Sequence, residues 1–139
     1  MVDDFYGRIT SRSQDVQARY DARRAALRLQ YGKDAPCPFC DDSRRDSSKD
    51  YGGIFVLANN YPYEVFDGRG VKEHLMIVPG RHVANFSDFT ETEIATYWQV
   101  LSKYHAKGYS SMTRSAIDTA RSVPAHLHTH LFLYFTDNE

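Results

Sequence analysis

The chain has 139 residues with 17 basic and 18 acidic side chains, and its net charge of −1 argues against a protein that binds polyanions over its whole surface. Its 42% hydrophobic and 25% charged residues are typical of one globular domain. No stretch approaches the 18 apolar residues of a membrane span, so none is expected. Because residues 1–5 lack the basic and apolar regions of a signal peptide, we expect a cytoplasmic protein.

Residues 9–31 are predicted to form the first helix, which Ser11 or Ser13 can cap and Gly32 can end. Several arginines make this helix locally basic. They can form a clamp for phosphates or nucleic acid, or a solvated face with nearby aspartates as counter-charges. The solvated face is the more common arrangement, and the role of the helix stays open.

Residues 33–50 are expected to form a polar loop that contains Cys37 and Cys40 at C-x-x-C spacing. In a reducing compartment this spacing indicates metal or redox chemistry. A thioredoxin-like pair would open a helix in a βαβ unit, whereas a long polar loop follows here. The pair is then half of a zinc site that needs two more ligands, or else two reduced thiols in a loop.

The middle of the chain predicts an antiparallel sheet. Residues 53–59 and 74–78 are apolar runs typical of strands, and residues 67–70 between them have a hairpin-turn composition. A further strand is expected within residues 112–120.

One helix is predicted over residues 90–107. Thr90 and Glu93 have the spacing of a capping box, and Gly108 can end the helix. Its apolar face is expected to pack against the sheet.

Residues 125–135 contain three histidines at strict alternation, which predicts a strand. Successive strand side chains point to opposite faces, so His126, His128 and His130 share one face. The other face is expected to join the core, and it carries Leu127, Leu131, Leu133 and Phe135. The outer histidines lie about 13 Å apart along a strand, so one metal cannot easily bind all three.

These residues indicate divided roles for the histidines. Thiolate and imidazole ligands suit tetrahedral zinc, and the candidates to complete the Cys37 and Cys40 pair are His82 and His126. His128 is then left on the same face without a ligand role. A neutral imidazole held at one nitrogen by a hydrogen bond can attack phosphorus through the other nitrogen.

Several segments together resemble the histidine triad (HIT) family. Residues 126–132 resemble its His-x-His-x-His signature, and residues 55–62 and 74–82 are similar to its nucleotide-contacting strand end and its following strand and turn. The C-x-x-C pair matches the zinc-binding branch. The hairpin at residues 63–68 is similar to the branch that contains galactose-1-phosphate uridylyltransferase. The resemblance covers roughly residues 36–135.

The resemblance implies a role for each matched residue. His128 would attack the α-phosphorus of a nucleotide to form a nucleotidyl-histidine, and His130 would hold phosphate oxygens. Water or another acceptor would resolve the intermediate. Asn59 would contact the nucleoside and His74 would support the site from the neighbouring strand. A structural zinc ion would be bound by Cys37, Cys40, His82 and His126.

The chain departs from the family pattern before the first histidine. The family carries Ser or Thr three residues before it, a position that Val123 occupies here. Ser122 is one residue earlier and can still donate to phosphate if Pro124 is an insertion. Arg121 stands in the family's Gly-rich, Gln-containing lead-in and can take the phosphate contact.

We therefore expect an α+β, HIT-like antiparallel sheet of about five strands over residues 33–139, with one packed helix and an added helical extension over residues 1–32. The expected activity is nucleotide hydrolysis or nucleotidyl transfer by a homodimer, without an organic cofactor. One alternative is a non-catalytic nucleotide- or RNA-binding module with structural zinc. Another alternative is a metalloenzyme that binds its ion through His126 and His128. This alternative needs further ligands downstream of the histidines, and the sequence offers no suitable set there.

Overall fold

The computed structural model describes residues 10–136. These residues divide into two compact units, which are described separately. The first contains residues up to 36 with residues 59–74 and the residues from 133 onward, and the second contains residues 37–58 and 75–132. The elements in chain order are α2 (Gln14–Tyr31), η1 (Pro38–Cys40), α3 (Asp42–Asp46), β1 (Lys49–Asp50), β2 (Ile54–Ala58), β3 (Val65–Phe66), β4 (Arg69–Pro79), η2 (Phe86–Asp88), α4 (Glu91–Ala106), β5 (Ser110–Met112) and β6 (Thr129–Tyr134).

The strands form an antiparallel sheet in the order β1-β2-β4-β6-β5, and β3 pairs with β4 outside this path. The sheet has six strands rather than about five, because the two-residue strands β1 and β3 add to the longer ones. In the second unit, β2 runs against the end of β4 with Val56 opposite Ile77. The predicted antiparallel α+β architecture is confirmed.

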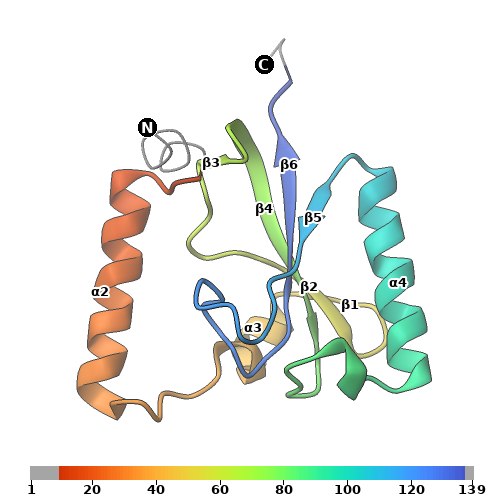
Figure 1. Cartoon of the computed structure of the whole chain (residues 1–139), viewed down its shortest axis with the longest axis horizontal. Helices are drawn as coiled ribbons and strands as arrows, with labels where there is room; N and C mark the ends of the chain where they lie inside the picture. The colour runs from red at the N-terminus through yellow and green to blue at the C-terminus, as the bar shows by residue number, and fades with distance from the viewer. Residues whose placement is uncertain (1–9, 137–139) are drawn as a thin grey trace. The chain divides into compact units, whose positions relative to one another are not determined.

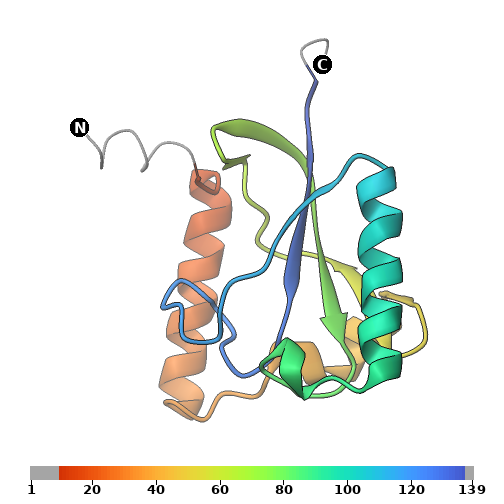
Figure 2. The same cartoon turned by 45° about the vertical axis from the view of Figure 1, so that its right-hand side comes forward.

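The sheet of the second unit has an apolar layer on each face. Helix α4 runs alongside the strands (Figure 1 and Figure 2). It contributes Tyr97, Val100 and Tyr104 to one layer, where they are buried with side chains such as Ile77 and Leu131. The next residues along β4 point to the opposite face, because strand side chains alternate. That face carries a smaller cluster of Phe39, Met76 and Val78.

Helix α4 begins and ends where the sequence predicts. The Thr90 hydroxyl accepts from the Glu93 N–H at 3.2 Å, and the Glu93 carboxylate accepts from the Thr90 N–H at 2.8 Å. Gly108 follows the helix with φ +97°, a conformation that glycine adopts without steric cost. The capping box and the glycine stop are both confirmed.

Glu93 also binds Arg81, which precedes His82 in the loop after β4. The guanidinium donates to both carboxylate oxygens at 2.9 and 2.7 Å, and this pairing lowers the pKa of Glu93 to about 2. The ion pair between Glu93 and Arg81 therefore stabilises the folded state above the ordinary carboxyl pKa, and this stabilisation is lost as the pH falls towards 2.

We predict that Glu93→Gln lowers the free energy of unfolding by about 1 kcal/mol at pH 7 and has little effect near pH 2. Urea unfolding at the two pH values measures the difference. Glu91→Gln, in the same helical turn, is the control for loss of one charge. An equal effect of Glu93→Gln at both pH values would contradict the prediction.

Helix α2 belongs to the first unit and has no fully buried residue. It begins at Gln14 with Ser13 as its cap and ends at Gly32, as predicted. Its predicted start is wrong over residues 10–13, because the Ser11 N–H donates to the Val65 carbonyl at 2.8 Å and holds this segment extended. Residue 9 lies outside the described residues.

The hairpin between β3 and β4 is also part of the first unit. Asp67 and Gly68 both have positive φ values, of 53° and 69°, which is the conformation of a type I′ turn. The turn prediction is confirmed, and β4 begins at Arg69 rather than at His74 because residues 69–70 pair with β3.

Two other predictions are wrong. No strand occupies residues 113–120, because hydrogen bonds from the Asp118 N–H to Ser115 and from the Arg121 N–H to Asp118 turn the backbone there. Phe135 is not a core residue, since it follows the end of β6 and is 51% exposed. Within residues 10–136, no helix combines the length and apolarity needed to cross a membrane.

Candidate functional site

The three alternating histidines are buried in the second unit. Strand β6 begins at Thr129 rather than at residue 125, because the backbone before it turns through a hydrogen bond from the His126 N–H to the Val123 carbonyl. The alternation nevertheless extends through the turn. Leu127 and Leu131 join the α4 side of the core, whereas His126 and His128 contact Phe39 on the opposite side.

His128 is held in one tautomer by the backbone. Its Nδ1 lies 3.0 Å from the His126 carbonyl oxygen, which can only accept. Nδ1 therefore carries the proton, and Nε2 keeps a free lone pair. Burial lowers the pKa of His128, so the imidazole is neutral at pH 7. His128 thus has the tautomer and charge state of a nucleophile.

His130 continues the row on β6. Its ring contacts His128 edge-on, with 5.1 Å between ring centroids, and stacks on Phe132 at 5.9 Å. It is 8% exposed, and both rings pack against it. This places a second imidazole beside His128, where it can donate to an oxyanion.

His126 has the opposite tautomer. Its Nε2 lies 2.8 Å from the Pro79 carbonyl oxygen and must carry the proton, which leaves the Nδ1 lone pair free. Burial lowers the pKa of His126 to about 4, so this lone pair stays unprotonated at neutral pH. That is the state in which an imidazole binds a metal.

The four predicted metal ligands are together in the second unit. The His126 Nδ1 lies 3.4 Å from the Cys37 Sγ, 3.6 Å from the Cys40 Sγ and 3.1 Å from the His82 Nδ1. The Cys40 Sγ is 3.3 Å from the His82 Nδ1, and all four atoms lie within 4.8 Å of one another. Zinc bond lengths of about 2.3 Å to sulfur and about 2.0 Å to nitrogen place tetrahedral ligand atoms roughly 3.3–3.8 Å apart. The donor set therefore fits a tetrahedral zinc ion.

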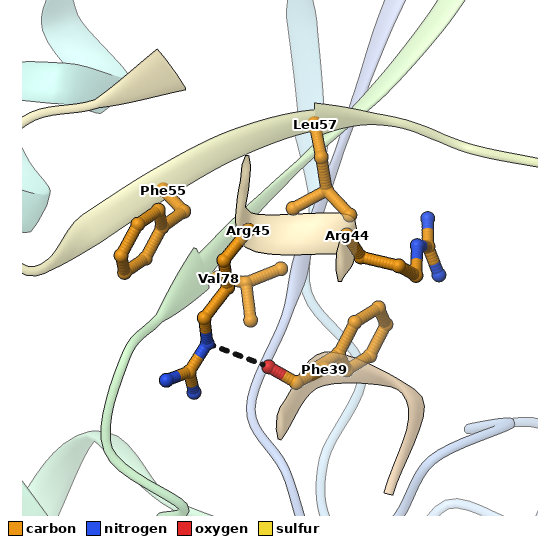
Figure 3. Close-up of a pocket in the computed structure, with 6 residues that line it drawn as sticks. All are labelled: Phe39, Arg44, Arg45, Phe55, Leu57 and Val78. Atoms are coloured by element: carbon orange, nitrogen blue, oxygen red, sulfur yellow. Dashed lines mark hydrogen bonds between the residues drawn. The ribbon is translucent and has the colours of Figure 1, made fainter. Parts of the chain in front are cut away.

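The turn that carries the cysteines is fixed by Arg45 of α3. The Arg45 Nε donates to the Phe39 carbonyl at 3.3 Å (Figure 3). Its Nη2 donates to the Gly80 carbonyl. A Cβ at position 80 would lie 3.1 Å from the Gly53 carbonyl oxygen, so glycine permits the close approach of the two strand ends there. Arg45 thus ties the cysteine turn to the loop that carries His82.

Arg121 and Ser122 precede the histidines, in the loop between β5 and β6. Arg121 is 3% exposed, and its Nη1 donates to the Pro124 carbonyl at 3.2 Å. Burial is the largest cause of the lowered pKa of His128, and the positive charges of Arg121 and Arg114 lower this pKa further. Ser122 is exposed, so its hydroxyl is available to solvent.

Asn59 and His74 belong to the first unit, where they are neighbours. The Asn59 N–H donates to the His74 carbonyl at 3.0 Å, and the Tyr63 N–H donates to the His74 Nδ1 at 3.1 Å. The Tyr63 ring stacks on the imidazole, with 5.3 Å between centroids. His74 is therefore held in place by its own unit.

Sequence reasoning missed two supporting groups. Phe39 lies between the cysteines in the chain, and its buried ring contacts both His126 and His128. The Thr129 hydroxyl binds the hydroxyls of Tyr97 and Thr113, which fixes the start of β6. Two sequence signals were available. Phe39 is an aromatic residue inside the C-x-x-C segment, and Thr129 carries a hydroxyl at a position of the histidine strand where the alternation predicts an apolar side chain.

Solved structures of HIT proteins resemble this chain, which has a HIT-like fold. A HIT family hydrolase from Legionella pneumophila Philadelphia 1 is 19% identical with a TM-score of 0.50, over 69% of this chain and 90% of its own. A HIT family hydrolase from Clostridium thermocellum is 21% identical with a TM-score of 0.51, over 74% and 93%. A histidine triad protein from Clostridium difficile is 17% identical with a TM-score of 0.50, over 72% and 90%. The sequence matches no protein-family model and no curated protein.

Proposed function

We propose that the protein is a nucleotide hydrolase or nucleotidyltransferase that acts at the α-phosphate through His128. The observation that carries this proposal is the tautomer of His128, whose Nδ1–H donates to the His126 carbonyl while Nε2 keeps its lone pair. The His128 pKa, lowered by burial, keeps this nitrogen unprotonated at neutral pH. HIT hydrolases among the solved structures of the same fold support the assignment.

The reaction has two balanced steps. His128 Nε2 bonds to the α-phosphorus, the bond to the leaving group breaks, and the leaving group departs with the electron pair and takes a proton from Ser122 or water. A water molecule or another acceptor then attacks the α-phosphorus, the bond from phosphorus to Nε2 breaks so that Nε2 regains its lone pair, and the proton that the acceptor loses returns to Ser122 or to solvent. His130 and Arg121 bind the phosphate oxygens and stabilise the charge that develops on them.

Zinc has a structural role in this proposal. Cys37, Cys40, His82 and His126 would hold the ion and thereby join the cysteine turn to the start of the histidine run. All four tetrahedral positions are then taken by protein, as in structural rather than catalytic zinc sites. Asn59 is proposed as a nucleoside contact and His74 as its support.

Intact mass after brief incubation with adenosine phosphoramidate, a dinucleoside polyphosphate or a UDP-sugar tests this function. We expect a nucleotidyl adduct or product formation with at least one of them. Nucleotide binding without an adduct or turnover would favour a non-catalytic binding module instead.

We further propose that the protein is a homodimer that associates through α4 and β5. Ile94 and Trp98 are one helical turn apart on α4 and are 52% and 69% exposed. Strand β5 ends the path of paired strands, so its outer edge can pair with a second copy.

We predict that Trp98→Ser converts the dimer to a monomer or raises its dissociation constant by about 100-fold, because buried tryptophans dominate interface energy. Sedimentation velocity over a range of concentrations measures this. Leu29→Ser on α2, where Leu29 is 90% exposed, is the control. A wild-type chain that is monomeric at all concentrations would contradict the proposed dimer.

A further inference from the structure

Arg12, which precedes the capping residue of α2, contacts the loop that follows β2. Its Nε donates to the Tyr61 carbonyl at 2.8 Å. Its guanidinium carbon lies over two rings, 4.1 Å from the centre of the Tyr20 ring and 4.5 Å from the centre of the Tyr63 ring. The face of an aromatic ring attracts a cation, and the planar guanidinium also stacks on it. One side chain therefore joins α2 to residues 61–63 of the first unit.

The start of α2 is attached to the same unit by two further contacts. The Ser11 and Val65 backbones exchange hydrogen bonds of 2.8 and 3.0 Å, and the Tyr20 ring meets the Tyr61 ring edge-on with 5.3 Å between centroids. Beyond Tyr20, every residue of α2 except the half-buried Leu27 is exposed. The helix is therefore held mainly at its beginning, by contacts with residues 61–65.

Tyr61 and Tyr63 in turn hold the residues that we propose as a nucleoside contact and its support. The Tyr61 N–H donates to the Asn59 Oδ1 at 2.7 Å, which is the hydrogen bond of an Asx turn and orients the Asn59 carboxamide. The Tyr63 N–H donates to the His74 Nδ1 at 3.1 Å, and the Tyr63 ring lies within 12° of parallel to the imidazole. Arg12 is therefore connected to each of these two side chains through a single intervening residue.

We infer that Arg12 is a positioning residue, which acts through Tyr61 and Tyr63 to hold Asn59 and His74 in their orientations. This inference rests on the proposed function and gives the helical extension a role in it, which is to set the affinity for the nucleoside part of the substrate. Side chains that are held in one orientation before binding lose less conformational entropy when the ligand binds. The nucleoside takes no part in the bond change at the α-phosphorus, so this gain acts equally on the bound substrate and on the transition state and affects KM rather than kcat.

Titration calorimetry with AMP and UMP tests this role. With whichever nucleotide the wild type binds, Arg12→Gln is expected to weaken binding about tenfold, because the ring contacts and the charge-assisted hydrogen bond to Tyr61 are lost. With a substrate that the wild type turns over, the same variant is expected to raise KM about tenfold and to change kcat by less than about twofold. Arg12→Lys keeps the charge without the planar guanidinium and is expected to restore part of the affinity.

Two control variants separate Arg12 from the rest of the helix. Arg23→Gln removes one exposed positive charge of α2 and is expected to keep the wild-type affinity. Ser13→Ala removes the hydroxyl that accepts from the Val16 N–H at 3.2 Å, which weakens the start of α2 but keeps the Arg12 side chain. This variant is expected to lose less affinity than Arg12→Gln. Equal losses in the two variants would assign the effect to the stability of the helix and overturn the positioning role.

NMR of the ligand-free protein separates this inference from the proposed function. In Arg12→Gln, the His74 imidazole and Tyr63 amide signals are expected to shift, whereas the imidazole signals of the exposed His105 should stay unchanged. Unchanged His74 and Tyr63 signals, or unchanged affinity for a nucleotide that the wild type binds, would overturn the inference. Weaker nucleotide binding by Arg12→Gln, with no turnover by the wild type, would refute the proposed activity and still support the role of Arg12. A wild type that binds no nucleotide would overturn both.

Discussion

His128→Asn is expected to abolish the nucleotidyl adduct and to lower kcat/KM by about 10⁴-fold with whichever substrate the wild type accepts. The physical reason is the removal of the His128 Nε2, whose lone pair is free because the His126 carbonyl holds the proton on Nδ1. Neighbouring groups that stabilise charge would still bind the substrate, so its affinity should change much less than its turnover. Intact mass and steady-state kinetics with the same substrate measure the two effects.

His105→Asn is the matched control for this experiment. His105 is an exposed histidine of α4 whose Nε2 lies 2.8 Å from the Ser111 hydroxyl, away from the histidine row along the chain. We expect wild-type kinetics from this variant. Retained adduct formation in His128→Asn would assign the nucleophile to another residue.

The pH dependence of the same reaction follows from the burial of His128. A protonated imidazole has no lone pair for attack, and burial lowers the pKa of this group below its ordinary value of 6.5. We therefore expect the acidic limb of the kcat/KM profile to have its midpoint below pH 6.5. A decline already centred at or above pH 6.5 would contradict this assignment.

Removal of the metal site should have the second large effect. We expect one zinc ion per chain, and we expect His82→Asn to lower the zinc content and to reduce the free energy of unfolding by roughly 3–5 kcal/mol. The reason is that the four ligands come from three separate segments of the second unit, so the ion replaces contacts that a small core does not supply. Elemental analysis and thermal unfolding measure the two quantities, and the melting temperature should fall by roughly 10 °C.

His105→Asn is also the control for His82→Asn. His105 is exposed like His82, and its substitution removes the same chemical group outside the proposed ligand set. It should keep both the zinc content and the melting temperature. Chelation of the wild type should reproduce the loss of stability seen in His82→Asn and should add little to that variant. Full stability of a zinc-free wild type would contradict the structural role of the ion.

Local sequence patterns predicted the parts of the fold that depend on local chemistry. The Thr90 and Glu93 capping box and the Asp67-Gly68 turn fix their backbones through neighbouring groups, and both predictions are confirmed. The antiparallel sheet was also predictable, because the apolar runs at residues 53–59 and 74–78 correspond to β2 and to the second half of β4.

Features set by distant partners were not predictable in the same way. Residues 112–120 have the alternation of a weak strand, yet turns around Asp118 hold residues 113–120 in another shape. The start of β6 depends on the hydroxyls of Tyr97 and Thr113, which reach Thr129 across 32 and 16 residues of chain. A local sequence pattern cannot predict contacts between residues so far apart in the chain.

The candidate site shows the same division. The proximity of the four candidate ligands agrees with the prediction from C-x-x-C and the histidine row, since thiol and imidazole side chains together suggest a ligand set. The Nε and Nη2 donors of Arg121, which lack a hydrogen-bond partner within residues 10–136, were not foreseeable, because burial and pairing are properties of the folded loop.

The hydrogen bond that orients His128 comes from the main chain of residue 126 and not from its imidazole. A substitution at position 126 therefore keeps the carbonyl that orients His128 even when it removes a proposed metal ligand. In evolutionary terms, the proposed metal site and the proposed nucleophile can diverge separately, provided that the turn at residues 123–126 keeps its shape. A descendant of this chain could exchange its metal ligands for an apolar cluster and retain the chemistry of the histidine two residues further on.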